Sequence, residues 1–272
     1  MLAHKHLFWW CISACASQAV RGLALPALQA PRSNGIVSRD GIEARGKGFA
    51  NGMALRIMPL GASITYGYGS KDKDGYRKDL RDKLEAGGNE VNMVGDNPSG
   101  EMKDNDTEGW KGYTVAMVHE KANKAVPEFK PNLILVNVGT NDCIKNEDLP
   151  DAGNRMTSLL NDLYRESPRA TVILSTLLVN RDDAVQKRTV DFNDQLKTVA
   201  SKFQLYGKRL VLVDMQGPKG PLKADLNADG THPNEVGYRK MADVWYDGIQ
   251  QADSRKYLQE AEAVKGIAPD GA

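Results

Sequence analysis

Residues 53–67 read Met-Ala-Leu-Arg-Ile-Met-Pro-Leu-Gly-Ala-Ser-Ile-Thr-Tyr-Gly. Residues 55–60 of this stretch are apolar apart from one arginine, and Gly61, Ala62 and Ser63 follow them directly. A run of this length and composition predicts a strand that is buried on both faces, as in a parallel sheet. Because ligands bind outside the carboxyl ends of such strands, Ser63 is expected at the ligand crevice.

Apolar runs of strand length recur along the chain, at residues 91–94, 133–138, 171–177 and 210–213. Apolar side chains at helical spacing separate these runs. The helical sets are Tyr76, Leu80 and Leu84, ending at Gly87-Gly88; Met156, Leu159, Leu160 and Leu163; Phe192, Leu196 and Val199; and Val236, Met241, Val244, Trp245 and Ile249. The alternation predicts a single α/β domain over residues 53–250, with a doubly wound sheet of about five parallel strands and helices on both faces.

The N-terminal residues have a different composition. Lys5 precedes an apolar stretch at residues 7–16, and small residues follow as far as Ala24. This pattern predicts a secretory signal peptide over residues 1–24, because the apolar stretch is too short to span a bilayer comfortably. The protein is therefore expected to be secreted. A buried N-terminal helix is the alternative.

Two further segments show no sustained apolar period. Residues 25–52 are rich in Arg, Gly, Ser and Ala, which is typical of a polar linker or pro-segment. Residues 251–272 are polar and rich in alanine. We expect them to extend the last helix and then to fray as a polar C-terminal tail.

The charge balance limits the classes of partner. The chain has 36 Lys and Arg against 35 Asp and Glu, which gives a formal net charge of +1. No basic surplus is present to neutralise phosphates, so the composition argues against nucleic-acid binding and against stable attachment to anionic membranes. The expected partner is a substrate alone, with the chain as a monomer.

Cysteine usage follows from the predicted signal peptide. Its removal would leave Cys143 as the only cysteine, so no intrachain disulfide is expected. The favoured role of this thiol is that of a small buried apolar group, with a reactive thiol as the alternative. The sequon at Asn105 would accept a glycan in a eukaryotic secretory pathway.

Counting histidines narrows the search for a general base. The chain has four, of which His4 and His6 belong to the predicted signal peptide. His119 lies in a predicted helix rich in Lys and Glu, where a surface role is expected. His232 stands in a loop beside Asp229 and is the best candidate for a base that titrates near neutral pH. Asp229 could hold the second ring nitrogen of this histidine, or it could cap the final helix instead.

The same loop invites a calcium interpretation. Residues 225–230 match the opening of an EF-hand loop, with oxygen ligands at alternate positions and a glycine at the sixth. The twelfth position should be a bidentate glutamate, but it is Val236, and Glu235 comes one place early. We therefore favour a catalytic interpretation of this loop and expect no metal and no cofactor.

Three residues at strand or helix ends could serve ester chemistry. Ser63 follows the first strand without a phosphate-binding loop and without the Gly-x-Ser-x-Gly elbow. Asn141, within Gly-Thr-Asn-Asp, offers a side-chain amide to a developing oxyanion, which can contribute about 10²–10³ in rate. Gly112 could add a backbone N–H at the start of the next helix. Each of these residues taken singly also has a purely structural explanation.

Taken together, four blocks resemble the SGNH, or GDSL-like, hydrolase superfamily. They are Ser63 with its flanking glycines, Gly112, Asn141, and His232 within Asp-Gly-Thr-His-Pro. The wording of residues 56–61 and 109–114 is most similar to carbohydrate esterase family 3, the acetylxylan esterases. The resemblance implies a flavodoxin-like sheet and metal-free ester hydrolysis through an acyl-enzyme.

The resemblance also implies residue roles. Ser63 would be the nucleophile, His232 the base and Asp229 the residue that orients it. The backbone N–H groups of Ser63 and Gly112 and the side chain of Asn141 would form the oxyanion hole.

Two departures bear on these roles. Ala62 stands where the family usually has an aspartate that helps to hold the active-site turn, so a looser or less active site is expected. Thr107 stands where these carbohydrate esterases often have histidine, which bears on the sugar preference.

The predicted function is that of a secreted serine esterase that removes small acyl groups, acetyl above all, from plant polysaccharide. A lysophospholipase or thioesterase of the same superfamily is the alternative. A non-catalytic binding protein on the same scaffold is a third possibility, motivated by Ala62.

Overall fold

The computed structural model describes residues 47–268. The predicted signal peptide and most of the predicted linker lie outside these residues. The described part contains a sheet in which every pairing is parallel, with the strand order β2-β1-β4-β5-β6 and a short β3 that pairs with β1. The strands are β1 (Leu55–Gly61), β2 (Val91–Met93), β3 (Glu108–Gly109), β4 (Leu133–Asn137), β5 (Thr171–Ser175) and β6 (Leu210–Val213).

Strand β1 lies at the point where the chain reverses its direction of travel across the sheet. It pairs with β4 along residues 57–61 on one edge, and with β2 and β3 on the other. This strand order is that of flavodoxin-like sheets, and the gap between the two strands that diverge is where such folds bind ligands. The predicted parallel, doubly wound sheet is confirmed. The two-residue β3 was not predicted, because it carries no apolar run.

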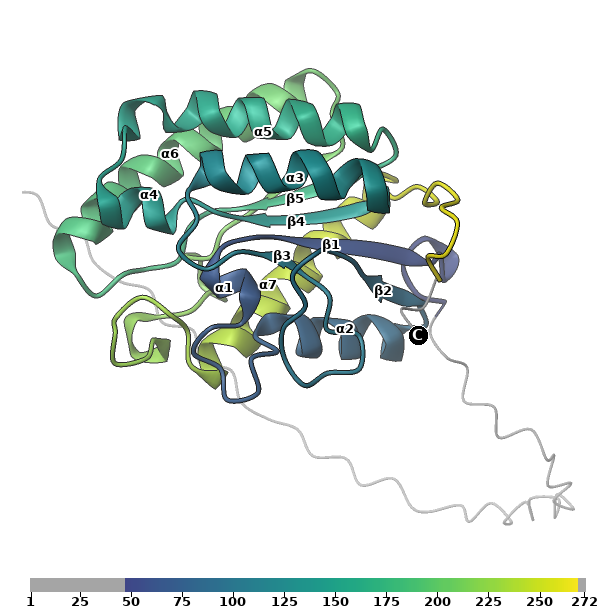
Figure 1. Cartoon of the computed structure of the whole chain (residues 1–272), viewed down its shortest axis with the longest axis horizontal. Helices are drawn as coiled ribbons and strands as arrows, with labels where there is room; N and C mark the ends of the chain where they lie inside the picture. Colours follow the sequence, from purple (N-terminus) through teal and green to yellow (C-terminus); the bar gives the residue numbers. More distant parts are fainter. Residues whose placement is uncertain (1–46, 269–272) are drawn as a thin grey trace, which may run out of the picture. The chain divides into compact units, whose positions relative to one another are not determined.

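Helices cover both faces of the sheet (Figure 1). Helices α3 (Val115–Phe129), α5 (Ala152–Glu166) and α6 (Asp183–Leu205) pack on one face, and α2 (Tyr76–Gly87) and α7 (Glu235–Ser254) pack on the other. The short helices α1 (Ser63–Tyr66) and α4 (Thr140–Lys145) follow β1 and β4. Single 3-10 turns are found at η1 (Phe49–Asn51), η2 (Leu149–Asp151) and η3 (Lys223–Asp225).

The apolar side chains form one core on each side of the sheet. In β1, Met58 and Leu60 point into the core beneath α3, α5 and α6, whereas Leu55 and Ile57 point into the core beneath α2 and α7. Side chains alternate between the faces of a strand. Both faces of β1 are covered by helices, so its run of apolar residues is continuous rather than alternating.

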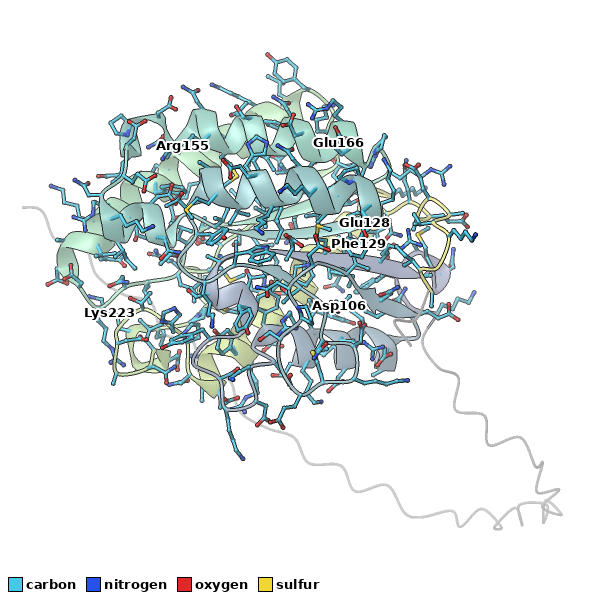
Figure 2. All side chains as sticks on the ribbon, in the orientation of Figure 1. Asp106, Glu128, Phe129, Arg155, Glu166 and Lys223 are labelled. Atoms are coloured by element: carbon cyan, nitrogen blue, oxygen red, sulfur yellow. The ribbon has the colours of Figure 1, made fainter. Side chains whose placement is uncertain are left out.

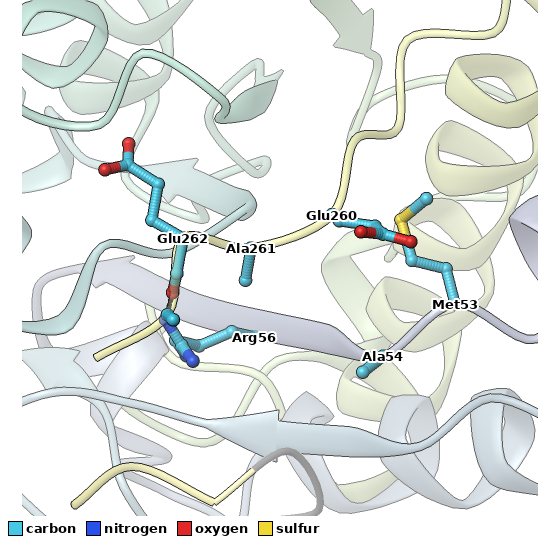
Figure 3. A pocket seen from close by; sticks show the side chains of 7 residues that line it. Met53, Ala54, Arg56, Glu260, Ala261 and Glu262 are labelled. Atoms are coloured by element: carbon cyan, nitrogen blue, oxygen red, sulfur yellow. Dashed lines mark hydrogen bonds between the residues drawn. The ribbon is translucent and has the colours of Figure 1, made fainter. Parts of the chain in front are cut away.

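The segment after α7 packs across the amino ends of the strands. Thr171 Oγ1 donates a hydrogen bond to Tyr257 O at 2.7 Å, and Asn132 Nδ2 donates to Gln259 O at 2.8 Å. Figure 3 shows Arg56 beneath the same segment, at a hollow of about 290 Å³. The expectation that this tail frays is therefore wrong for residues 257–268, because their backbone carbonyls satisfy side-chain donors of the sheet.

No helix within residues 47–268 combines the length and apolar character needed to cross a membrane.

Candidate active site

The turn between β1 and α1 places Ser63 at the carboxyl end of the sheet. A side chain on Gly61 would put its Cβ 2.2 Å from Asn137 O, so the close approach of β1 and β4 at this point requires glycine. Trp110 N donates a hydrogen bond to Gly61 O at 3.0 Å, which brings the segment after β3 against the same turn. Ser63 is half-buried at the start of α1.

Three side chains form a continuous hydrogen-bonded chain. Ser63 Oγ lies 2.8 Å from His232 Nε2, and His232 Nδ1 lies 2.7 Å from Asp229 Oδ2. The carboxylate accepts the Nδ1–H, so Nε2 is left as the acceptor for the serine hydroxyl. A neutral imidazole in this tautomer can take the hydroxyl proton, which is the geometry that defines Ser-His-Asp triads on unrelated folds.

Asp229 is tied to its own loop by its other oxygen. Its Oδ1 accepts hydrogen bonds from Thr231 N at 2.9 Å and from His232 N at 3.0 Å. Partial burial by itself would raise the pKa of this carboxyl, but these two bonds and the imidazole hold the pKa below its ordinary value. The alternative role of Asp229 as the cap of the final helix is wrong, because Asn234 Oδ1 accepts from Val236 N at 2.9 Å and caps α7.

An arginine that sequence reasoning missed holds this loop in place. Arg181 lies between β5 and α6, and its guanidinium donates three hydrogen bonds to backbone carbonyls of the loop that leads to His232. The acceptors are the carbonyl oxygens of Lys223 at 3.0 Å, Leu226 at 2.6 Å and Asn227 at 2.9 Å; Lys223 is labelled in Figure 2. No local pattern marks Arg181, because its acceptors lie more than forty positions along the chain.

Gly112 and Asn141, the other two predicted oxyanion donors, follow β3 and β4, the strands that pair with the carboxyl end of β1 on either side. Gly112 follows β3 with φ of 81°, a left-handed conformation that suits glycine, and a side chain there would enter open space. Asn141 follows β4, and its Nδ2 donates to Tyr113 O at 2.9 Å. A primary amide has two N–H groups, so one remains for a ligand.

Asp142, the residue after Asn141, contacts the start of α3 and a side chain of α5. Its Oδ2 accepts from Val115 N at 3.0 Å at the start of α3, and its Oδ1 lies 3.3 Å from Nη2 of Arg155; Arg155 is labelled in Figure 2. Asp142 is fully buried, and this burial raises the pKa of its carboxyl above the ordinary value. The contacts join the start of α4 to the start of α3, which positions both Asn141 and the segment before Val115.

Ala62 and Thr107, the two residues that depart from the pattern of the SGNH hydrolases that this chain resembles, are both buried. Ala62 offers no side-chain cap to α1, so backbone bonds hold the turn: Tyr66 N donates to Ala62 O at 3.0 Å, and Tyr68 N donates to Ser63 O at 2.9 Å. Thr107 Oγ1 donates to Pro59 O at 3.3 Å, beneath β1. The chain from Ser63 to Asp229 is thus formed without an aspartate at position 62.

The remaining candidates lie outside this constellation. His119 Nε2 lies 2.7 Å from Asp162 Oδ2, so this histidine bridges α3 and α5 at a partly exposed position. Cys143 is free and fully buried, which confirms its favoured role as a small buried apolar group, and burial raises the pKa of its thiol to about 12. Asp225 Oδ2 is engaged by Lys240 Nζ at 2.5 Å. Within residues 47–268, no group of three or more potential ligands is arranged for a metal.

A parallel, doubly wound sheet with a hydrogen-bonded serine, histidine and aspartate at its carboxyl end defines the class of SGNH-type hydrolases. The chain belongs to the GDSL-like lipase/acylhydrolase family, whose model matches residues 60–240.

The chain is similar to one curated esterase and to several solved esterase structures. It is 28% identical over 227 residues to a multidomain esterase of Ruminococcus flavefaciens; the match covers 72% of this chain and 28% of that protein. Among solved structures it resembles a Clostridium thermocellum family 3 carbohydrate esterase, with a TM-score of 0.67 and 24% identity over 75% of this chain and 98% of the other. An acetyl xylan esterase from Geobacillus stearothermophilus has a TM-score of 0.56 at 20% identity, covering 73% and 96% of the two chains. The likeness to these structures concerns the fold.

Proposed function

We propose that this protein is a secreted serine esterase that removes small acyl groups, acetyl above all, from plant polysaccharide. The observation that carries the proposal is the pair of side-chain hydrogen bonds that joins Ser63, His232 and Asp229. Ser63 Oγ lies 2.8 Å from His232 Nε2, and His232 Nδ1 lies 2.7 Å from Asp229 Oδ2. The names of the relatives, a family 3 carbohydrate esterase and an acetyl xylan esterase, support an acetylated sugar as the substrate. The signal-peptide pattern of residues 1–24 supports secretion.

In the first half of the proposed reaction, Ser63 Oγ attacks the ester carbonyl carbon while its proton passes to His232 Nε2. The carbonyl oxygen becomes an oxyanion that the N–H groups of Ser63 and Gly112 and the Asn141 amide stabilise. His232 then gives the proton to the alcohol oxygen as the carbon–oxygen bond breaks. The products of this half are the free alcohol and an acyl group on Ser63.

In the second half, a water molecule takes the place of the alcohol. His232 removes a proton from this water as its oxygen attacks the acyl carbon, and the same oxyanion donors act again. Collapse of this intermediate returns the proton to Ser63 and releases the carboxylic acid. Asp229 keeps the imidazole in the required tautomer throughout and stabilises its transient positive charge.

Acyl-chain-length profiling tests the substrate class. Purified protein is mixed with acetylated xylan and with p-nitrophenyl esters of increasing acyl length, and acid release is measured. We expect acetate release from xylan and a preference for the shortest acyl group. Cleavage of long acyl esters without acetate release would contradict the proposal and favour the lysophospholipase or thioesterase alternative.

A fluorophosphonate probe tests the nucleophile. The probe is expected to label the wild type and not the variant Ser63→Ala. Ser201→Ala is the matched control, because Ser201 is an exposed serine of α6 whose hydroxyl donates to Lys197 O. Labelling of the Ser63→Ala variant at the wild-type rate would assign the nucleophile elsewhere.

A further inference from the structure

Tyr68 presents an open aromatic face directly beside the catalytic histidine. Its ring centroid lies 4.6 Å from that of His232, with the two planes tilted by 59°. The residue is 48% exposed, although a tyrosine buries a large apolar area when it packs. The other aromatic residue of comparable exposure within residues 47–268 is Tyr206, at the end of α6.

The exposed ring is carried by a backbone that is held on both sides. Tyr68 N donates to Ser63 O at 2.9 Å, and Tyr68 O accepts from the hydroxyl of the buried Tyr238 at 2.6 Å. The next residue, Gly69, has φ of 93°, and its carbonyl accepts from Asn227 Nδ2 at 3.0 Å. The backbone of residues 68–69 is thus tied both to the nucleophile turn and to the histidine loop, which fixes the point from which the Tyr68 ring projects before a ligand binds.

The direction of proton transfer tells which part of an ester meets this ring. His232 Nε2 must deliver its proton to the alcohol oxygen, whereas Gly112 and Asn141 receive the carbonyl oxygen. The alcohol portion of the substrate therefore lies on the histidine side of Ser63. Among the residues that the structure describes, Tyr68 is the aromatic side chain in ring contact with that histidine.

We propose that Tyr68 is a specificity-determining platform on which the sugar ring of the leaving alcohol stacks. This inference rests on the proposed function and adds the subsite that recognises the alcohol. A pyranose has an apolar face of C–H groups and a rim of hydroxyls, so it can cover a flat exposed ring while its hydroxyls stay in water. Stacking of the sugar on Tyr68 also places the ester oxygen next to His232, so that binding orients the substrate for proton transfer.

The test compares two acetyl esters on the same enzyme preparation. One is a monoacetylated methyl xylopyranoside, and the other is ethyl acetate, whose alcohol is too small to cover the ring; acid release is followed in a pH-stat. The ratio of kcat/KM for the sugar ester to that for ethyl acetate is expected to fall at least about tenfold in Tyr68→Ala, which corresponds to about 1.4 kcal/mol. Because both rates share one preparation, the ratio does not depend on the folded fraction.

Two variants complete the test. Tyr68→Phe keeps the ring and is expected to keep the ratio close to that of the wild type. Tyr206→Ala removes an exposed tyrosine from the opposite end of the sheet and serves as the matched control. An unchanged ratio in Tyr68→Ala, or an equal fall in Tyr68→Phe, would overturn the proposal.

The failure of this inference is distinguishable from that of the proposed function. If the wild type cleaves neither ester, the proposed function fails. If the wild type cleaves both esters and the ratio is insensitive to position 68, the esterase stands and the platform fails.

Discussion

The most discriminating perturbation is a comparison of two substitutions at Asp229, because the structure predicts which of them is worse. Oδ1 accepts from the backbone N–H groups of Thr231 and His232, and Oδ2 accepts from the imidazole. In Asp229→Asn, the side-chain oxygen must stay on the two backbone donors, because turning the amide would set its NH₂ against them. The NH₂ group then faces His232 Nδ1, which must become an acceptor.

That reversal places the imidazole proton on Nε2, where it blocks proton transfer from Ser63. In a serine protease the equivalent substitution costs about 10⁴ in kcat, which corresponds to about 5.5 kcal/mol of transition-state free energy. Asp229→Ala removes the carboxylate without imposing the wrong tautomer. Because the Asp229 side chain is 43% exposed, water can take its place, and we expect a loss closer to about 10².

The assay is kcat/KM on p-nitrophenyl acetate for both variants, with circular dichroism spectra to verify folding. Asp162→Asn is the matched control, since Asp162 makes a contact of the same 2.7 Å length with His119 away from the site. Its activity is expected to equal that of the wild type. An Asp229→Asn enzyme as active as Asp229→Ala, or more active, would refute the tautomer argument.

Four further outcomes follow from other contacts. Arg181→Ala removes three hydrogen bonds to the histidine loop and should lower kcat about ten- to hundredfold with little change in KM. Arg181→Lys should recover part of this loss, and a change in KM alone would contradict the prediction. Cys143 should react with Ellman's reagent only after denaturation, because burial raises the pKa of its thiol to about 12; rapid reaction of native protein would count against this. A chain ending at Ser254 loses four side-chain hydrogen bonds to the tail and should lose about 4 kcal/mol in urea unfolding, whereas an unchanged midpoint would show the tail to be dispensable. The folded-state pKa of Asp229 is lowered, so the excess Tm of the wild type over Asp229→Ala should be constant above about pH 4 and vanish as the pH falls through that lowered value; persistence in strong acid would be inconsistent.

Most of the fold could be predicted because each long strand carries its own signal. Residues 55–60 contribute apolar side chains to both cores, so the composition of this run alone predicts a buried parallel strand, without knowledge of the strands that pair with it. Strand β3 could not be predicted in this way, because Glu108–Gly109 is defined by pairing with Leu60 and Gly61 rather than by its own composition. Packing of the tail at residues 257–268 was missed for the same reason.

The residues of the candidate site also fall into those that the local sequence indicates and those that only tertiary contacts reveal. His232 could be found by counting, and Ser63 and Asn141 by their places after apolar runs. Asp229 kept two interpretations until Asn234 was seen to cap α7. Arg181 was not predicted, since it acts on carbonyls that any residue could supply.

By itself, the sequence determined the alternation of strands and helices and the chemical groups available at the carboxyl end of the sheet. These properties depend on composition and on the period of apolar residues, both of which are local. Only the tertiary structure decided that Asp229 turns toward His232, that Arg181 and Asp142 hold the surrounding loops, and that the ring of Tyr68 stays open beside the histidine. Each of these depends on distances between residues remote in the chain, and such distances are set by the packing of the whole domain.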